Sequence, residues 1–247
     1  MALVKISRGA DIQHNYANGV SRVSILEGAY KDATVERISL QPGADFSAEL
    51  YTREQHNQVF LITAGKGYIV TPRRVFNITE VSVFVPDFDK ESVTFHCAAD
   101  AKETMEIVHF VTELNDYDKT CLKEAHMSLP RFRGVSGAWH YKEDFTGADI
   151  QQMMLLEHRN LGRLSMGANF GTGPNYIGQH IHNELEQWYI MLPGASFTYT
   201  AENEKIHVQG GDITPHGSHH GSECADGEKF AYVWFELCEN GYPGEIK

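Results

Sequence analysis

The chain has 247 residues, 42% of them hydrophobic and 11% aromatic, which is ordinary for a folded globular protein of one large or two small domains. Its formal net charge of −12 at pH 7, without a cluster of lysine and arginine, argues against a nucleic-acid-binding surface. It also lacks an apolar run of eighteen residues and an apolar N-terminal segment of the export type, so we expect no membrane contact and a cytoplasmic location.

In chain order, residues 1–115 are predicted to form short strands, because β-branched and aromatic residues alternate with Gly, Pro, Asn and Asp. Residues 116–150 change in character, and we expect a linker with a short helix over 118–127. Residues 151–247 return to the strand pattern. Many short strands of this kind are typical of small antiparallel barrels and jelly rolls, so the sequence predicts an all-β protein.

The two strand-rich regions also resemble each other in sequence, which predicts an internal duplication. The matches occur in the same order along both regions, and their offset drifts by only a few residues. The matched stretches are residues 37–40 with 163–166, 43–46 with 167–170, 59–65 with 188–194, 84–86 with 213–215, and 97–100 with 224–226.

A histidine-rich segment in the second region carries the clearest chemical signal. His180 and His182 are two residues apart, and Glu186 follows four residues later. On one extended strand these three side chains would point to the same face, where they could bind a divalent metal. A second histidine-rich segment, residues 215–220, can supply a fourth ligand.

The first segment resembles a motif of the cupin family. That motif reads His-x-His, three or four residues, Glu, and then a glycine turn. Here it is His180-x-His182-x3-Glu186, and Gly194 follows one residue later than the family spacing.

The second segment resembles the other cupin motif, Pro-x-Gly-x2-His, as Pro215-x-Gly217-x2-His220. The resemblance implies two tandem cupin jelly-roll barrels, with His180, His182, Glu186 and His220 as metal ligands. The strand before Pro215 is short, so the choice between His220 and His219 as the fourth ligand stays open.

The first barrel, residues 1–115, is expected to have lost the metal site. Tyr51, Arg53 and Asn57 align with the three ligands of the first motif, and Glu91 aligns with His220. An arginine at such a site would repel a cation. We therefore expect one metal site per chain, in the second barrel, residues 151–247.

Three histidines and one carboxylate leave positions open on a five- or six-coordinate ion, and they suit Mn, Zn, Fe, Co or Ni. A pair of barrels with an active second barrel resembles uronate and other sugar isomerases, and also the aminohydrolase that acts on ureidoglycine. The resemblance implies a metal-dependent isomerase that acts on a small polar carbonyl or sugar-like substrate through an enediolate. A dioxygenase or an aminohydrolase on the same site, or a small-ligand-binding protein without catalysis, are the alternatives.

Three residues beside the motifs are candidate acid–base groups, namely Glu184, Tyr176 and His219. Few basic residues occur in the second region, so a neutral sugar is as plausible a substrate as a uronate. Jelly-roll barrels commonly cover their exposed sheet edges by association, which predicts a homodimer or a higher homo-oligomer.

Overall fold

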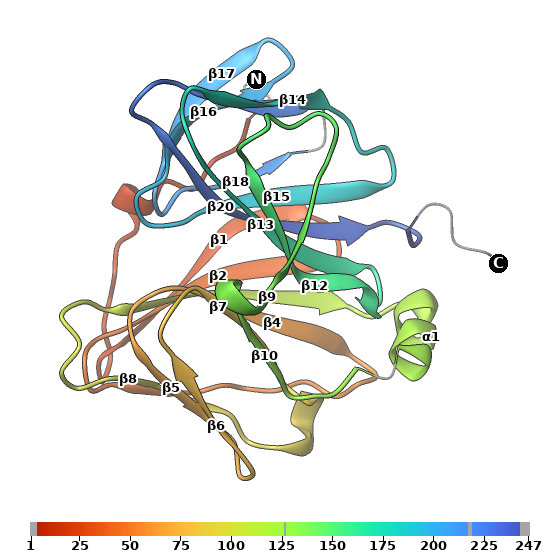
Figure 1. The fold of residues 1–247 in the computed structure, drawn as a ribbon. Helices are drawn as coiled ribbons and strands as arrows, with labels where there is room; N and C mark the ends of the chain where they lie inside the picture. Colours follow the sequence, from red (N-terminus) through yellow and green to blue (C-terminus); the bar gives the residue numbers. More distant parts are fainter. Residues whose placement is uncertain (1–3, 126, 217–218, 243–247) are drawn as a thin grey trace. The chain divides into compact units, whose positions relative to one another are not determined.

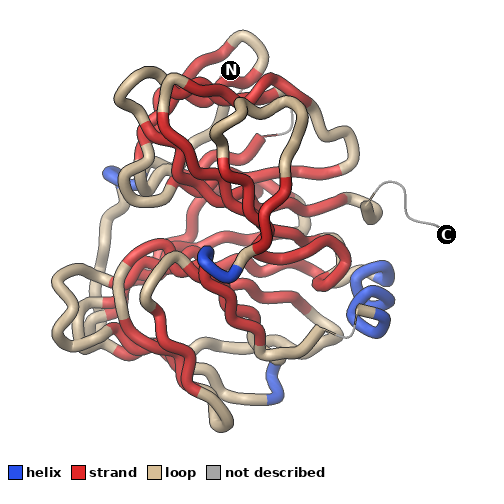
Figure 2. Tube along the Cα trace, in the orientation of Figure 1, coloured by secondary structure: helices blue, strands red, loops and turns tan. Residues whose placement is uncertain are grey.

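A computed structural model describes residues 4–125, 127–216 and 219–242 of the chain. The chain divides into two compact units. The C-terminal unit contains residues 1–11, 120–125 and 138–247, and the N-terminal unit contains residues 12–119 and 126–137. Strands dominate both units (Figure 2), as the all-β prediction requires. No helix in the described part of the chain is long and apolar enough to cross a membrane.

The N-terminal unit consists of two antiparallel sheets (Figure 1). In sheet order, the first contains β1 (Val20–Tyr30), β2 (Ala33–Leu40), β9 (Met105–Glu113), β4 (His56–Ala64), β7 (Ser82–Val85) and β10 (Arg131–Gly134). The second contains β3 (Asp45–Ser47), β8 (Thr94–Cys97), β5 (Gly67–Val70) and β6 (Val75–Ile78). Short 3-10 turns lie at Phe88–Lys90 and Val135–Gly137.

The core of the N-terminal unit lies between its two sheets. Phe60 on β4 and Phe95 on β8 are both fully buried, and their ring centroids are 4.9 Å apart. Ile38, Phe84 and Ile107 belong to the same buried cluster. Sheets that bury one face against each other in this way form a jelly roll.

The C-terminal unit is a single curled antiparallel sheet of ten strands. Along its main path lie β11 (Trp139–Tyr141), β12 (Gln151–Leu161), β13 (Leu164–Thr172), β20 (Lys229–Cys238), β16 (Ser196–Ala201), β19 (His220–Cys224) and β14 (Asn175–His180). Off this path, β15 (Leu185–Met191) pairs with β20 and with β18 (Ile213–His216), and β17 (Glu204–Gln209) pairs with β16. The central strand β20 is buried along almost its whole length.

The N-terminal segment of the chain belongs to the C-terminal unit. Ser7 forms a bridge with Ile213 of β18, and Arg8 forms an ion pair with the buried Asp212 at 2.6 Å. A 3-10 turn follows at Gly9–Asp11. The one α-helix of the described residues, α1, spans Asp116–Glu124, within the segment that the sequence identified as a linker. The four cysteines are buried free thiols.

The strand pairing of the two units is the same. The order β1-β2-β9-β4-β7 in the N-terminal unit corresponds to β12-β13-β20-β15-β18 in the C-terminal unit, and β3-β8-β5-β6 corresponds to β14-β19-β16-β17. The predicted pair of tandem barrels is therefore confirmed at the level of fold.

The pairing registers also show which residues are equivalent. Ala33 at the start of β2 corresponds to Leu164 at the start of β13, because each closes the hairpin with the preceding strand. The sequence alignment of residues 37–40 with 163–166 was therefore wrong, because it placed the second half of β2 against the start of β13. By contrast, Gln58 on β4 and Gln187 on β15 occupy equivalent positions, as the sequence alignment had them.

Candidate metal centre

Three histidines of the C-terminal unit converge on one point. His180 ends β14, His182 lies in the turn that follows, and His220 begins β19, directly opposite His180 in the sheet. One ring nitrogen from each histidine lies within 4.8 Å of the others. Within residues 4–125, 127–216 and 219–242, this is the one group of three or more histidine, cysteine or acidic side chains that lies this close together.

The protonation states of these histidines suit a metal. Burial lowers the pKa of His180, and it lowers that of His182 to about 4, with the neighbouring His180 adding to the effect. Both rings are therefore neutral at pH 7, which leaves a lone pair for an ion. The Nδ1–H of His180 donates a hydrogen bond to the carbonyl oxygen of Gly178 at 2.8 Å, and this bond leaves Nε2 as the ligand atom.

The spacing of the three rings is close to that of a metal site. Two nitrogens bound to one ion at about 2.1 Å lie at most about 4.2 Å apart. The observed nitrogens, within 4.8 Å of one another, need only small side-chain rotations to reach that geometry. Phe145 stacks on the ring of His180 with centroids 4.1 Å apart and supports its orientation. The donor set therefore fits a divalent transition metal.

A buried polar chain extends from His220 into the unit. The Nε2–H of His220 donates to Oε1 of Gln187 at 3.0 Å, and Nε2 of Gln187 donates to Oε1 of Glu236 at 2.5 Å. The hydroxyl of Ser165 donates to the other carboxyl oxygen of Glu236 at 3.1 Å. Burial raises the pKa of Glu236 to about 7, although both hydrogen bonds lower it. Gln187 therefore orients His220 and links it to a buried carboxyl group.

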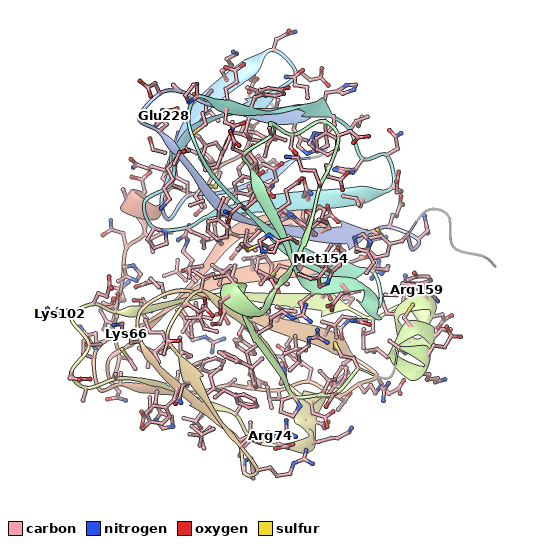
Figure 3. All side chains as sticks on the ribbon, in the orientation of Figure 1. Lys66, Arg74, Lys102, Met154, Arg159 and Glu228 are labelled. Atoms are coloured by element: carbon pink, nitrogen blue, oxygen red, sulfur yellow. The ribbon has the colours of Figure 1, made fainter. Side chains whose placement is uncertain are left out.

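A cavity of about 560 Å³ opens beside the histidines, entirely within the C-terminal unit. His180, His182, Gln187 and Glu236 line one part of it. Aromatic rings and carboxylates form much of the remaining wall, together with Met154 of β12, which is labelled in Figure 3. A cavity of this size matches those that bind small molecules.

Glu186, the predicted carboxylate ligand, is not part of the histidine cluster. Its side chain is exposed, whereas the next residue, Gln187, is buried at the site. The sequence argument assumed one continuous strand from His180 to Trp188, but residues 181–184 are not in a strand. Strict alternation of faces does not hold across such a break. Counted from Glu186, the glycine turn at Gly194 comes one residue later than in the cupin motif. Counted from Gln187, the spacing agrees with the motif, so the sequence did contain a signal that position 187 faces the site.

The structure also separates the two candidate histidines of the second motif. His220 is buried in the cluster, whereas His219 is exposed and lies 3.6 Å from Glu202. Pro215 ends up opposite Trp188 in the pairing of β15 and β18, while Gly217 lies outside the described residues.

The three predicted acid–base residues lie in different places. Glu184 lines the cavity, as expected for a residue that acts on a substrate. Tyr176 is 57% exposed, and neither it nor His219 is among the residues that line the cavity. The sequence did not single out Glu236, which lies on β20 about fifty residues after the first histidine motif; only the strand pairing of β15 with β20 brings it to the site.

Comparison with known proteins shows similarity in structure only. No family model matches the sequence, and no curated protein matches it either. Among solved structures, the Escherichia coli protein Ylba superimposes with a TM-score of 0.71 at 12% identity, covering 98% of this chain and 92% of that one. A cupin 2 conserved barrel domain protein from Leptotrichia buccalis superimposes with a TM-score of 0.63 at 13% identity, covering 97% and 98%.

A third solved structure is a variant of oxalate decarboxylase from Bacillus subtilis. It superimposes with a TM-score of 0.65 at 10% identity, covering 96% of this chain and 78% of that one. The chain has the cupin fold. Proteins with this fold include an enzyme, oxalate decarboxylase, but identities of 13% or less give no information on the activity of this chain.

Proposed function

We propose that the C-terminal cupin barrel is a metal-dependent catalytic site that isomerises a small polar carbonyl or sugar-like compound. The observation that carries the proposal is the meeting of three clustered histidines with a cavity of about 560 Å³ that is also lined by the buried carboxyl group of Glu236. Structural metal sites are closed by protein ligands, whereas catalytic sites keep positions open to a substrate.

The histidines would hold the ion, and the cavity would hold the substrate. His180, His182 and His220 would bind one divalent ion of Mn, Zn, Fe, Co or Ni. Such an ion supplies Lewis acidity toward carbonyl and hydroxyl oxygens. Gln187 orients His220 through its amide oxygen, which is the usual role of a hydrogen-bonding partner behind a histidine ligand.

Glu236 is the residue that we assign to proton transfer. Isomerisation needs one group that removes a proton from a carbon beside the carbonyl and returns it to the neighbouring carbon. The carboxyl group of Glu236 lines the cavity, and Ser165 and Gln187 fix its orientation. Glu184 also lines the cavity and is the second candidate for this role. Phe145 and Trp234 contribute apolar wall, which excludes water from the reacting atoms.

Exchange of substrate hydrogen with solvent deuterium tests this proposal. The metal-loaded protein is incubated in D2O with a panel of aldoses and ketoses and followed by NMR. We expect deuterium at the carbon next to the carbonyl, together with the isomeric sugar. Metal-free protein and the Glu236→Gln variant should give neither. Glu223→Gln, which changes an exposed glutamate paired with Lys205, is the matched control and should retain activity.

Each of the three alternative functions would give a different measurable result in the same samples. Oxygen consumption would indicate a dioxygenase, and ammonia release from amino compounds would indicate an aminohydrolase. Saturable binding without any turnover would indicate a small-ligand-binding protein. Each of these results, without deuterium incorporation, contradicts the isomerase proposal.

A further inference from the structure

The wall of the cavity in the C-terminal unit has an unusual charge balance. Four carboxylates line it, those of Glu143, Glu157, Glu184 and Glu236, whereas none of the described lining residues is a lysine or an arginine. The basic residues nearby in sequence have other partners. Arg159 forms an ion pair with Glu124 of α1 at 3.2 Å (Figure 3), and the ammonium group of Lys142 donates to the carbonyl of Gly147. These carboxylates, taken by themselves, therefore favour a cation over an anion in their part of the cavity.

One side of this cavity combines carboxylates with aromatic rings. Trp139 and Tyr141 lie on β11, Glu143 follows that strand, and Glu157 lies on the adjacent β12. The two rings are 6.0 Å apart in an edge-to-face arrangement, and the indole N–H of Trp139 donates to Glu157 at 3.3 Å. We call these four residues the aromatic–acidic wall. Aromatic faces beside carboxylates are a common setting for an organic ammonium group.

An unpartnered acceptor on the cavity wall indicates the same kind of ligand. Asn169 is only 5% exposed, and its Nδ2 donates to the hydroxyl of Tyr232 at 2.6 Å. Its Oδ1 is fully buried and has no hydrogen-bond partner among the described residues. A buried acceptor without a partner costs about 1–3 kcal/mol, so a ligand that supplies an N–H or O–H donor would relieve this cost.

In the N-terminal unit, the position equivalent to Gln152 of the C-terminal unit is occupied by an arginine, which supplies a cation from the protein itself. By strand register, Arg22 of β1 corresponds to Gln152 of β12, because they pair with the equivalent residues Ile38 and Asn169. Arg22 donates two hydrogen bonds to Glu36, at 2.8 and 3.0 Å. The C-terminal unit has a neutral glutamine in place of this arginine, so no protein cation offsets its carboxylates.

From these observations we infer that the substrate carries a protonated amine, which binds at the aromatic–acidic wall while its oxygen end faces the histidines. The inference rests on the proposed function and narrows its substrate class to amino sugars and related amino carbonyl compounds. Asn169 then accepts a hydrogen bond from a hydroxyl or ammonium group of the same molecule. At the aromatic–acidic wall, the carboxylate of a uronate would face Glu143 and Glu157 without a basic partner among the described lining residues.

Three matched polyols of equal chain length test the inference, because they differ mainly in charge. Glucamine is a cation at pH 7, sorbitol is neutral, and gluconate is an anion. Binding to the metal-loaded protein is measured by calorimetry and by the fluorescence of the cavity tryptophans Trp139 and Trp234. We expect glucamine to bind at least about tenfold more tightly than sorbitol, and gluconate to bind most weakly.

Two variants and a control locate the effect. Glu143→Gln and Glu157→Gln should each weaken glucamine binding by about three- to tenfold and leave sorbitol binding unchanged. Glu223→Gln, outside the cavity, should change neither. Equal affinity for the three polyols, tightest binding of gluconate, or no binding of glucamine at millimolar concentration would overturn the inference.

The metal-free protein separates this inference from the proposed function. The preference for glucamine over gluconate should persist without metal, because the aromatic–acidic wall does not include the histidines. If the protein binds metal and isomerises neutral sugars but shows no preference for the ammonium group, the inference fails and the proposed function stands. If the protein prefers glucamine over gluconate but binds no metal, the proposed function fails and the ammonium-binding role of the aromatic–acidic wall stands.

Discussion

The two barrels of this chain share one strand order but differ in what occupies the equivalent interior positions. In the C-terminal unit, the amide of Gln187 joins His220, a candidate metal ligand, to the carboxyl group of Glu236 beside an open cavity. In the N-terminal unit, the equivalent Gln58 contacts His109 at 3.2 Å and the backbone carbonyl of Glu49 at 2.9 Å. The equivalent glutamines therefore belong to a candidate catalytic network beside a cavity of about 560 Å³ in one barrel, and to a hydrogen-bonded network beside a smaller cavity of about 240 Å³ in the other.

The charged groups beside the smaller cavity of the N-terminal unit are paired with one another. Arg22 and His109 both donate to Glu36, and His109 stacks on Phe60 with ring centroids 4.1 Å apart. Burial lowers the pKa of His109, so the ring is neutral and donates its Nδ1–H. A site that satisfies its charges internally gains stability and loses the open donors that a ligand needs. The same strand order therefore holds quite different interior side chains in the two barrels.

The largest difference between the two units is expected when the clustered histidines of the C-terminal unit are removed. The double variant His180→Ala/His182→Ala should lose nearly all bound metal and reduce activity by more than about 100-fold, because one histidine cannot hold the ion alone. As a control, the double variant His14→Ala/His96→Ala removes two histidines of the N-terminal unit that belong to no such cluster, and it should retain both metal and activity. Metal content by ICP-MS and turnover on the same samples decide the matter, and equal metal in the two variants would be incompatible with the site.

The two equivalent glutamines should respond differently. Gln187→Ala should weaken metal affinity by about 10- to 100-fold, because His220 loses the acceptor that orients it. Gln58→Ala should leave metal affinity unchanged and lower the free energy of unfolding by about 2 kcal/mol, since it leaves buried polar groups without partners. Competitive metal titration and chemical denaturation measure the two quantities. Similar metal affinities in both variants would contradict the assigned role of Gln187.

Acid should weaken the N-terminal unit through Glu36. Burial alone would raise the pKa of this carboxyl group, but hydrogen bonds from His109 and Arg22 outweigh it and lower the pKa to about 2. A pKa below the usual 4.5 gives stability that is present above about pH 4.5 and is lost as the pH falls toward 2. Because the pair is partly exposed, we expect about 1–2 kcal/mol. Calorimetry of Glu36→Gln should show that part of the acid sensitivity abolished; an unchanged pH profile would refute it.

The smallest effects are expected at the residues that the structure places outside the site. Glu186→Ala and His219→Ala should each change metal affinity by less than about twofold, because both side chains are exposed and outside the histidine cluster. Metal titration of the two variants checks this result. If Glu186→Ala lowered metal affinity as much as Gln187→Ala, Glu186 would instead be the fourth metal ligand.

The sequence predicted the fold, the duplication and the three histidines because these depend on local patterns. Strand-forming composition and the spacing of His180, His182 and His220 are visible along the chain without knowledge of its pairing. Glu186 lies outside the histidine cluster, and the neighbouring Gln187 faces His220 instead, because the segment 181–184 interrupts the alternation of faces on which the prediction depended.

The rest of the site depends on contacts between strands that are distant in sequence. Glu236 reaches Gln187 only through the pairing of β20 with β15, and Asn169 reaches the cavity through the register of β13. Neither residue lies in a motif. The charge balance of the cavity wall likewise emerges only once β11 and β12 are paired, because Trp139, Tyr141 and Glu157 are otherwise unremarkable surface types.

The metal stoichiometry of the wild-type protein tests the central claim most directly. The protein is stripped with a chelator, reconstituted separately with Mn, Zn, Fe, Co or Ni, and analysed by ICP-MS after removal of free metal. We expect about one ion per chain for the metals that suit three histidines, held by the C-terminal unit. Two ions per chain, or none with any of these metals, would contradict it.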